Sequence, residues 1–292
     1  MKKKQIFKGV ATALATPFKD GKIDYSSLKR MIDFQISGGV DAILVCGTTG
    51  ESPSLGDEET HKLIDKSAEL IDGRVKMIVG TGSLSMSRAL EQSKFASEHG
   101  ADGLLVITPF YNKGTKKGIA EYFCRIANHT DKPIIIYNVP SRTGVDISLD
   151  TVSDIYEEEN IVAIKEASGN IDKSLDLATF FPELFIYSGN DTMTLPILSL
   201  GGCGVISVLS NVLPSECSNM CSKYFDGRTE EALSLQKRMT PLMHLMFSDV
   251  NPAPVKAALS IIGMCENELR LPLTKVSTEL YLKIQSALSE FV

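Results

Sequence analysis

The 292-residue sequence lacks any long hydrophobic run and any basic block. No stretch of roughly 18 apolar residues is present, so no membrane-spanning helix is expected. The N-terminal segment MKKKQIFKGV becomes polar too early for a signal peptide, which predicts a cytoplasmic protein. With a formal net charge of -6 and no basic cluster with interleaved aromatic residues, neither nucleic acid nor a membrane surface is expected as a partner.

Cysteine and histidine are also scarce. Six cysteines in a chain this long lack the density of a disulfide scaffold and are expected to be reduced thiols. Cys217 and Cys221 lie four residues apart on a predicted helix, but two thiols without further ligands are more typical of packing than of a zinc site. The four histidines share no ligand spacing with the cysteines, so neither a metal nor another cofactor is predicted: His61, His99, His129 and His244.

Short β-branched runs recur along the chain, separated by segments with helical spacing that often end at glycine. Near-continuous apolar strands that alternate with helices indicate a parallel sheet covered on both faces. Eight such units favour a closed (β/α)8 TIM barrel over an open doubly wound sheet, since no dinucleotide-type glycine fingerprint follows the first strand. The runs are residues 9–18, 40–49, 74–82, 101–110, 132–140, 160–167, 184–190 and 202–211.

The C-terminal part of the chain shows only helical patterns. Residues 230–247, 254–263 and 277–292 have the spacing of helices, and no low-complexity linker precedes them. We therefore expect a catalytic barrel over residues 1–226 and a small helical appendage over residues 227–292.

The ends of the predicted strands carry polar and reactive residues. In barrel enzymes the chemistry lies at the C-terminal ends of the strands. Lys165 ends the strand IVAIKEASGN, where alternation places it on the same face as Ala163 and Ile161. An amine buried in an apolar barrel has a lowered pKa and is partly neutral near pH 7, as a Schiff-base nucleophile must be. A pairing of Lys165 with Glu166 is the alternative, although Glu166 should point to the opposite face.

Four further residues near strand ends are candidates for the same site. Tyr137 could move protons during imine formation, though alone it reads as a core tyrosine with a satisfied hydroxyl. The turn GTTGES lets the amides and hydroxyls of Thr48 and Thr49 face a carboxylate, but such turns are common. Arg142 in SRTG suits a second carboxylate, or is an ordinary surface arginine.

Seven segments together resemble the dihydrodipicolinate synthase family, of the pyruvate-dependent class I aldolase superfamily that includes N-acetylneuraminate lyase. The similarity runs from the first strand to the C-terminal helices in the family's order. The segments are GTTGES, TPFYNK, YNVPSRTG, AIKEASGN, SGND, GGCGVISVLSN and NPAPVK.

The resemblance implies a role for each matching position. It makes Lys165 the imine-forming residue and Tyr137 its proton donor and acceptor, with Thr48 and Tyr111 in a proton relay. Tyr111 then reaches in from a neighbouring subunit, which implies a homodimer or homotetramer. Thr49 would hold the carboxylate of pyruvate, the carbonyl of Ile206 would lie beside it, and Arg142 would bind L-aspartate 4-semialdehyde. Gly189 and Asn190 would line the mouth of the site.

The resemblance also implies a reaction and shows four departures. The reaction is condensation of pyruvate with L-aspartate 4-semialdehyde to 4-hydroxy-tetrahydrodipicolinate, in diaminopimelate and lysine biosynthesis. Lysine-inhibited relatives have histidine, asparagine, glutamate and tyrosine at the positions that match 60, 84, 88 and 110, and this chain has a different residue at each. Arg88 would repel the ammonium of lysine and Leu84 removes a polar partner, which predicts no inhibition by L-lysine. The residues here are Thr60, Leu84, Arg88 and Phe110.

Two other functions stay open at this stage. A sister aldolase or lyase that acts on a sugar acid would share Lys165, Tyr137 and the glycine-threonine turn, but is expected to lack Arg142. A non-catalytic barrel is expected to have lost one of the residues that form the imine or move protons. All four are present in this chain: Thr48, Tyr111, Tyr137 and Lys165.

Overall fold

A computed structural model describes residues 3–291 of the chain. The strands are β1 (Gly9–Ala13), β2 (Phe18–Lys19), β3 (Lys22–Ile23), β4 (Ala42–Val45), β5 (Lys76–Gly80), β6 (Gly103–Ile107), β7 (Ile134–Asn138), β8 (Ile161–Glu166), β9 (Phe185–Ser188) and β10 (Gly204–Ser207). The α-helices are α1 (Tyr25–Ser37), α2 (Asp57–Ile71), α3 (Met86–Glu98), α4 (Lys116–Ala127), α5 (Pro140–Thr143), α6 (Leu149–Tyr156), α7 (Ile171–Phe180), α8 (Thr194–Ser199), α9 (Pro214–Phe225), α10 (Thr229–Leu245), α11 (Ala253–Ile261) and α12 (Thr278–Leu288). Three short 3-10 helices are η1 (Ser52–Ser54), η2 (Asp191–Met193) and η3 (Leu209–Asn211).

Eight parallel strands form a closed barrel in the order β1-β10-β9-β8-β7-β6-β5-β4. Each of the eight predicted runs contains one of these strands, so the (β/α)8 barrel is confirmed and the open doubly wound sheet is wrong. The apolar runs are explained by burial, because a barrel strand faces the lumen on one side and helices on the other.

A short hairpin of β2 and β3 was not predicted. Phe18 pairs with Ile23 and Lys19 with Lys22, which leaves Asp20 and Gly21 as a two-residue turn. Both turn residues have positive φ, 52° and 76°. An Asp-Gly pair is a strong hairpin signal because both residues tolerate this conformation, so the sequence did contain the information.

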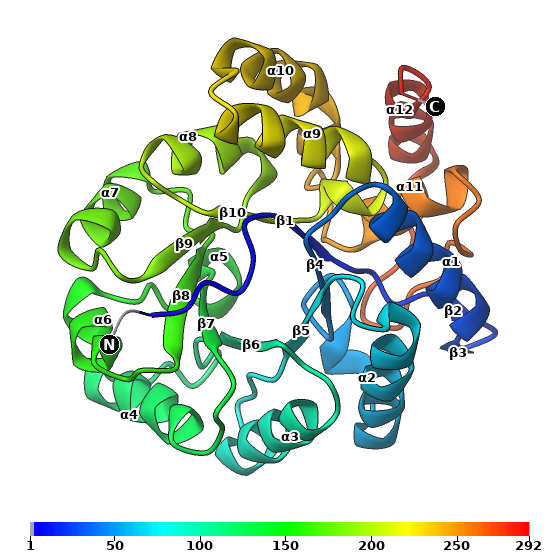
Figure 1. The fold of residues 1–292 in the computed structure, drawn as a ribbon. Helices are drawn as coiled ribbons and strands as arrows, with labels where there is room; N and C mark the ends of the chain where they lie inside the picture. The colour runs from blue at the N-terminus through cyan, green and yellow to red at the C-terminus, as the bar shows by residue number, and fades with distance from the viewer. Residues whose placement is uncertain (1–2, 292) are drawn as a thin grey trace. The chain divides into compact units, whose positions relative to one another are not determined.

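The chain divides into two compact units, and the first contains residues 76–206 and the N-terminal segment up to Lys8. Its strands β7 and β8 consist entirely of buried residues. Helices α3, α4, α6 and α7 lie outside the strands of this unit (Figure 1). Because β7 and β8 pair in parallel, with Tyr137 opposite Lys165 and Asn138 opposite Glu166, their carboxyl ends bring four side chains to one edge.

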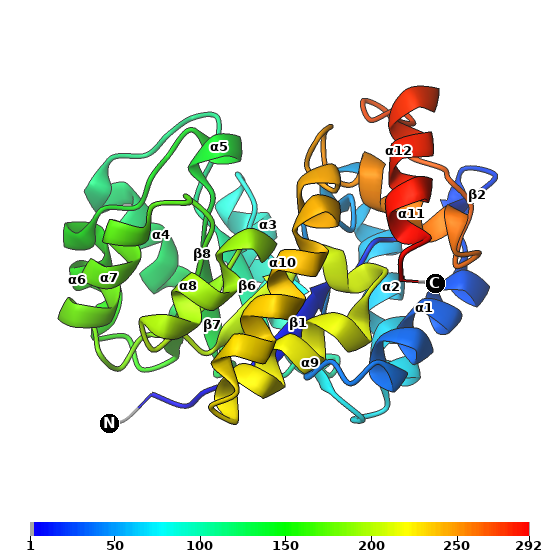
Figure 2. The ribbon, with the colours of Figure 1, turned by 90° about the horizontal axis from the view of Figure 1, so that it is seen from above.

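The second unit contains residues 9–75 and 207–292. It holds β1 and β4, the helices α1 and α2, and the C-terminal helices, in which α9 packs beside α10 and α11 beside α12 (Figure 2). The three helices expected near the C-terminus are present as α10, α11 and α12. A division into a barrel and an appendage at residue 226 stays a prediction.

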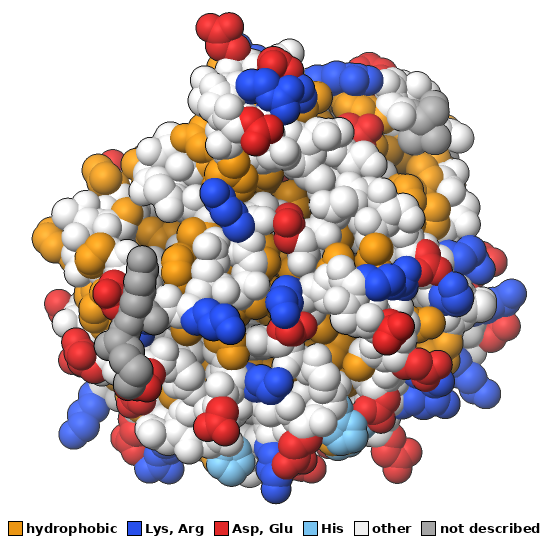
Figure 3. All heavy atoms as spheres, in the orientation of Figure 1, with side chains coloured by type: hydrophobic (Ala, Val, Ile, Leu, Met, Phe, Trp, Pro, Cys, Tyr) orange, Lys and Arg blue, Asp and Glu red, His pale blue; other side chains and the backbone are white. Residues whose placement is uncertain are grey.

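Charged side chains of both signs are interspersed over the face drawn in Figure 3. The chain has 30 lysine and arginine residues and 36 aspartate and glutamate residues, so its net charge comes from a small excess of acid. Any positive charge that binds an anion must therefore come from particular residues rather than from the surface as a whole.

Candidate active site

The carboxyl ends of β7 and β8 place Tyr137 and Lys165 side by side. They are partners in the parallel ladder, so their side chains lie on the same face. The Lys165 Nζ lies 4.3 Å from the centroid of the Tyr137 ring, and the Lys165 side chain is only 4% exposed. The alternative pairing of Lys165 with Glu166 is wrong, because the Glu166 carboxylate instead accepts hydrogen bonds from Asn138 and Ser168.

The environment of Lys165 favours its neutral amine. Burial is the main cause that lowers the pKa of Lys165 to about 7. The Asp191 carboxylate raises this pKa in part, and the Arg142 guanidinium lowers it further. A lysine with this pKa is a substantial fraction neutral at pH 7, whereas an ordinary lysine is almost fully protonated. The lowered pKa predicted from the sequence is therefore found for the buried amine.

Arg142 lies on an exposed one-turn helix that follows β7 directly. Pro140 begins α5 and Gly144 ends it with φ of 65°, a conformation that favours glycine. The Arg142 side chain is exposed, yet its charge acts on Lys165. A guanidinium there can recognise a carboxylate that enters from solvent.

Asp191 belongs to the site, and the sequence analysis did not select it. It begins η2 directly after Gly189 and Asn190, it is buried, and its charge raises the pKa of Lys165. The segment SGND had been singled out, so the signal was present in the sequence. What the sequence could not reveal is which polar residue of the segment is buried near the amine.

Gly189 and Asn190, which precede Asp191, differ in their contacts. Gly189 donates its N–H to the Glu166 carbonyl at 2.7 Å, and a Cβ on it would lie 2.5 Å from the Ala167 Cβ, so this contact requires glycine. Asn190 is half-buried, and its N–H donates to the Ser188 hydroxyl at 3.3 Å. Ile206, on β10, is fully buried, so only its backbone is suited to a polar contact.

Tyr111 differs from the buried residues of the site in its exposure. The side chain of Tyr111 is 85% exposed. The residues on either side of Tyr111 are hydrogen-bonded to each other, since the N–H of Asn112 donates to the Phe110 carbonyl at 2.7 Å. This tight turn gives Tyr111 a φ of 62°, which is uncommon for a residue with a side chain. The phenol on this turn is therefore accessible to another molecule.

The turn that carries Thr48 and Thr49 belongs to the second unit. The N–H of Gly50 donates to the Gly47 carbonyl at 3.1 Å, and the N–H of Glu51 donates to the Thr48 carbonyl at 3.1 Å. Thr49 is buried, and its Oγ1 accepts a hydrogen bond from Asn251 Nδ2 at 3.0 Å. The hydroxyl hydrogen of Thr49 is thereby left to donate to a different acceptor.

Asn251 is a second residue that the sequence analysis did not select. Its segment NPAPVK was noted only as part of the family resemblance. The side chain of Asn251 is buried against the threonine turn although the two are distant in sequence. A contact of this kind has no local signal, because neither turn chemistry nor periodicity specifies it.

The structure of residues 3–291 bears on metal ligation and on membrane insertion. Within that part of the chain, no group of three or more histidine, cysteine, aspartate or glutamate residues is arranged to hold a metal ion. None of its helices combines the length and the apolar character that crossing a membrane requires.

The chain is similar to known proteins over nearly its whole length. A model of the Dihydrodipicolinate synthetase family matches residues 6–291. A protein of Alkaliphilus oremlandii named 4-hydroxy-tetrahydrodipicolinate synthase is 48% identical over 270 residues, which cover 92% of this chain and 93% of the relative. The crystal structure of dihydrodipicolinate synthase from Aquifex aeolicus has a TM-score of 0.96, 44% identity, and coverage of 98% of both chains. The dihydrodipicolinate synthase of Cyanidioschyzon merolae with lysine bound has a TM-score of 0.94 and 38% identity, and again 98% of both chains is covered.

A closed (β/α)8 barrel with a buried lysine, whose pKa is lowered to about 7, against a tyrosine ring is typical of the class I aldolases, which are lyases. With a family match of this extent, the chain belongs to the dihydrodipicolinate synthetase family, an enzyme family of diaminopimelate and lysine biosynthesis. The resemblance noted in the sequence is therefore confirmed.

Proposed function

We propose that this enzyme condenses pyruvate with L-aspartate 4-semialdehyde through an imine on Lys165, giving 4-hydroxy-tetrahydrodipicolinate in the cytoplasm. The observation that carries the proposal is the buried Lys165 amine, with a pKa of about 7, 4.3 Å from the centroid of the Tyr137 ring. Family membership supports the choice of substrates, since relatives of 41–48% identity are named for this product.

The first step forms the imine. The neutral Lys165 amine adds to the ketone carbon of pyruvate, and the resulting carbinolamine loses its hydroxyl as water. The Tyr137 phenol donates the proton that this leaving hydroxyl needs, and it then serves as a base in its phenolate form. Thr48 and Tyr111 relay protons between the phenol and solvent.

The second step forms the carbon–carbon bond. The protonated imine withdraws electrons, so the methyl group of pyruvate loses a proton and an enamine results. The enamine carbon adds to the aldehyde carbon of the semialdehyde, whose oxygen takes up a proton. The amino group of the semialdehyde then attacks the imine carbon, and the bond to Lys165 breaks, which releases the free lysine and a cyclic imine.

Binding residues orient the two substrates for these steps. Thr49 donates its hydroxyl hydrogen to the carboxylate of pyruvate, in keeping with the bond that Thr49 accepts from Asn251. The carbonyl of Ile206 lies beside the bound pyruvate. Arg142 pairs with the carboxylate of the semialdehyde, at a mouth that Gly189 and Asn190 line.

The assembly is a homodimer or a homotetramer in which Tyr111 completes the site of a neighbouring subunit. The support is its 85% exposed phenol on a tight turn. A tyrosine so exposed is accessible to a second chain, and a symmetric pair of chains can exchange such residues without a change of fold.

The test is borohydride trapping with pyruvate, followed by peptide mass mapping. We expect a pyruvyl adduct on Lys165 that is depleted when L-aspartate 4-semialdehyde is added before the reductant. Lys165→Met is the control and should give no adduct. An adduct that the semialdehyde does not affect would point to a sister lyase of sugar acids, and the absence of an adduct on the unaltered protein would disprove the imine.

A further inference from the structure

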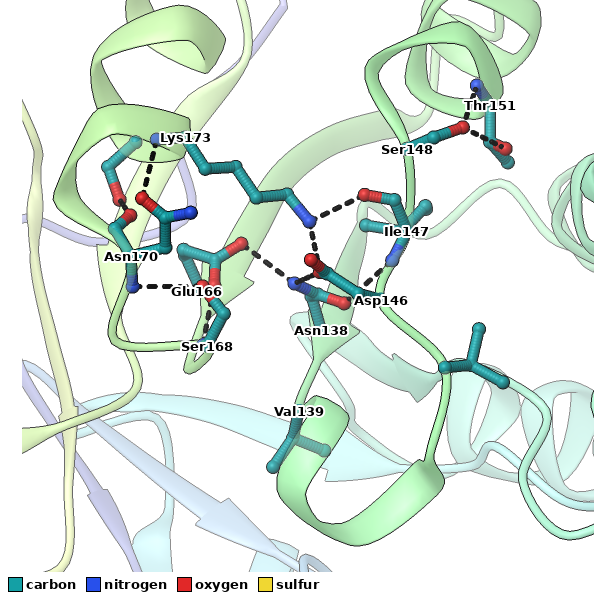
Figure 4. A network of polar contacts seen from close by, with 12 residues as sticks. Asn138, Val139, Asp146, Ile147, Ser148, Thr151, Glu166, Ser168, Asn170 and Lys173 are labelled. Carbon is teal, nitrogen blue, oxygen red and sulfur yellow. Dashed lines mark hydrogen bonds and ion pairs between the residues drawn. The ribbon is translucent and has the colours of Figure 1, made fainter.

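A buried polar network lies behind the pair of Tyr137 and Lys165. The next residues along the two strands, Asn138 and Glu166, are also partners in the ladder, and both are buried. Because strand residues alternate, this second pair points away from the face that carries the amine and the phenol. Figure 4 shows the two side chains directed toward each other between β7 and β8.

Both the nitrogen and the oxygen of the Asn138 amide are hydrogen-bonded. Its Nδ2 donates to Glu166 Oε2 at 2.9 Å and to Asp146 Oδ1 at 2.9 Å, and its Oδ1 accepts from the Ile147 N–H at 3.0 Å. Two carboxylate acceptors on one side and one N–H donor on the other fix the orientation of the amide. The Asn138 side chain therefore connects β7, on which it lies, to β8 and to the loop that contains Asp146 and Ile147.

Glu166 and Lys173 complete the network. Glu166 Oε1 accepts from the Ser168 N–H at 2.6 Å, so both oxygens of the carboxylate are in use. Lys173, on α7, donates to the Ile147 carbonyl at 2.5 Å and forms an ion pair with Asp146. This cation offsets the negative charge that Glu166 and Asp146 place in a partly buried region, as buried carboxylates require.

The network connects the parts that carry the reactive groups. Asn138 closes the loop from residue 138 to residue 147 through Ile147, and that loop contains α5 with Arg142. Glu166 fixes the end of β8 one residue beyond Lys165. The Asn138–Glu166 bond therefore joins the two strand ends that carry the phenol and the amine, and Asn138 also holds the loop that carries the guanidinium.

We propose that Asn138 and Glu166 are positioning residues, whose hydrogen bond holds the Tyr137 phenol and the Lys165 amine in reacting geometry. The inference rests on the proposed imine chemistry at Lys165. Neither residue contacts substrate in this role, since both lie on the outer face of their strands. Misplacement of reacting groups by about 1 Å can cost about 100-fold in rate, so a positional role has measurable consequences.

A charge exchange between the two positions tests the proposal. In Asn138→Asp, two carboxylates face each other across the former hydrogen bond. In Glu166→Gln, the new amide must turn its NH2 group toward either the Ser168 N–H or the Asn138 NH2. The double variant Asn138→Asp/Glu166→Gln restores complementarity between positions 138 and 166: the amide at 166 accepts from Ser168 and donates to the carboxylate at 138, which still accepts from Ile147. Recovery should be partial, because the carboxylate at 138 then faces Asp146, to which Asn138 donates in the original protein.

Each variant is compared by its kcat, its KM for pyruvate, its rate of borohydride-trapped adduct formation and its thermal midpoint. We expect each single variant to lose at least about tenfold in kcat and in trapping rate, with KM for pyruvate within about threefold of the original. The double variant should recover at least about half of that loss on a logarithmic scale. Single variants that fold and keep the original rates, with only a lower thermal midpoint, would show a merely structural role and overturn the proposal.

Asn160→Asp is the matched control. Asn160 precedes β8 at its opposite end, and its Nδ2 also donates to two acceptors, the carbonyls of Ala127 and Thr130 at 2.8 and 2.7 Å. We expect a lower thermal midpoint with unchanged kcat, and an equal loss of kcat would overturn the proposal. If the unaltered protein forms no adduct, the proposed function fails and the inference fails with it, whereas an adduct with unaffected variants overturns the inference alone.

Discussion

The Glu51 carboxylate and the Lys256 ammonium lie 2.5 Å apart, and their side chains are 1% and 0% exposed. Lys256 Nζ also donates to the Glu268 carbonyl at 2.7 Å and lies 4.0 Å from the centroid of the Phe18 ring. Glu51 Oε2 accepts from the Arg270 N–H at 3.0 Å. Because Glu51 is the fifth residue of the segment GTTGES and Lys256 lies on α11, this ion pair connects the threonine turn to the C-terminal helices of the same unit.

Removing the cation of this pair should destabilise the protein strongly. Lys256→Met leaves the Glu51 carboxylate buried without its counter-ion, and the loss of one partner of a buried pair costs about 3–5 kcal/mol. Lys256→Met/Glu51→Gln removes both charges and should recover part of the loss. The measurement is the thermal midpoint of each variant, and equal midpoints for the single and double variants would contradict the expectation.

The exposed ion pair of Lys29 and Asp33 is the control for this experiment. Its atoms are also 2.5 Å apart, but the two side chains are 62% and 35% exposed. Solvent screens such a pair, so Lys29→Met should change stability by no more than about 0.5 kcal/mol. Because the two ion-pair distances are the same, a larger loss for Lys256→Met then reflects burial, together with the Glu268 hydrogen bond and the Phe18 contact of Lys256.

Much of the site followed from the sequence because barrel geometry concentrates chemistry at strand ends. Lys165 and Tyr137 each lie at the end of an apolar run, and alternation places Lys165 on the same face as Ala163 and Ile161. Asp191 and Asn251 were missed for different reasons. Asp191 lies in a polar segment whose burial pattern has no period, and Asn251 reaches Thr49 from a distant part of the chain.

The polar network around Asn138 and Glu166 shows the same limit of prediction from the sequence. Glu166 was expected to point away from Lys165, and it does, but nothing in the local pattern shows that Asn138 meets it. Such a pair depends on the register of two strands that are joined by α5, α6 and their loops. Register is fixed by tertiary packing, so pairs across strands become visible only in the folded chain.

The pH dependence of imine formation should follow the neutral fraction of Lys165. Since the neutral amine is the nucleophile, the trapping rate at fixed pyruvate should rise with pH, inflect near the pKa of about 7, and level off above it. Below the inflection the rate should fall by about tenfold for each pH unit. An inflection at the ordinary lysine value near pH 10.5 would contradict a buried amine.

Two charge variants should move this inflection in opposite directions. The groups that act on the Lys165 pKa besides burial are Asp191, which raises it, and Arg142, which lowers it. Arg142→Gln removes the repulsion between two cations, so the inflection should move to higher pH. Asp191→Asn removes the anion that stabilises the ammonium, so it should move to lower pH. Shifts in the same direction would show that the charges do not act as assigned.

The Tyr137 phenol should be needed for rate but not for the packing of Lys165. Tyr137→Phe keeps the aromatic ring against the amine and removes only the hydroxyl. General acid–base groups contribute about 10²–10⁴-fold, so kcat and the trapping rate should fall by about that factor. The pH inflection of the residual trapping should stay near 7, because burial of Lys165 is unchanged. A loss below about threefold would exclude Tyr137 as the proton donor.

Mixed subunits can show whether Tyr111 acts across chains. A chain with Tyr111→Phe and a chain with Lys165→Met are each expected to be nearly inactive. If Tyr111 serves its neighbour, a hybrid dimer has one intact site, with Lys165 from the first chain and Tyr111 from the second. Random re-association should then restore about a quarter of the original activity per chain. No recovery after confirmed exchange of subunits would place Tyr111 in its own chain's site or outside catalysis.

L-Lysine should not inhibit this enzyme. A site that receives the ammonium of lysine needs acidic or polar partners, and this chain has an arginine and three less suitable residues at the corresponding positions: Thr60, Leu84, Arg88 and Phe110. The Thr60 hydroxyl is already used within α2, where it donates to the Gly56 carbonyl at 2.9 Å. Leu84 is exposed and offers no hydrogen bond, and Arg88 would repel an incoming ammonium.

A coupled assay over a range of L-lysine up to several millimolar tests this expectation, and isothermal titration shows whether lysine binds without effect. The variant Leu84→Asn/Arg88→Glu supplies the two missing polar partners and should show weak lysine binding, because the repulsion becomes an attraction. Strong inhibition of the unaltered enzyme by millimolar lysine would contradict the prediction. It would also mean that an ammonium can be held beside Arg88, which requires anionic groups elsewhere, since none of the residues at the four positions is anionic.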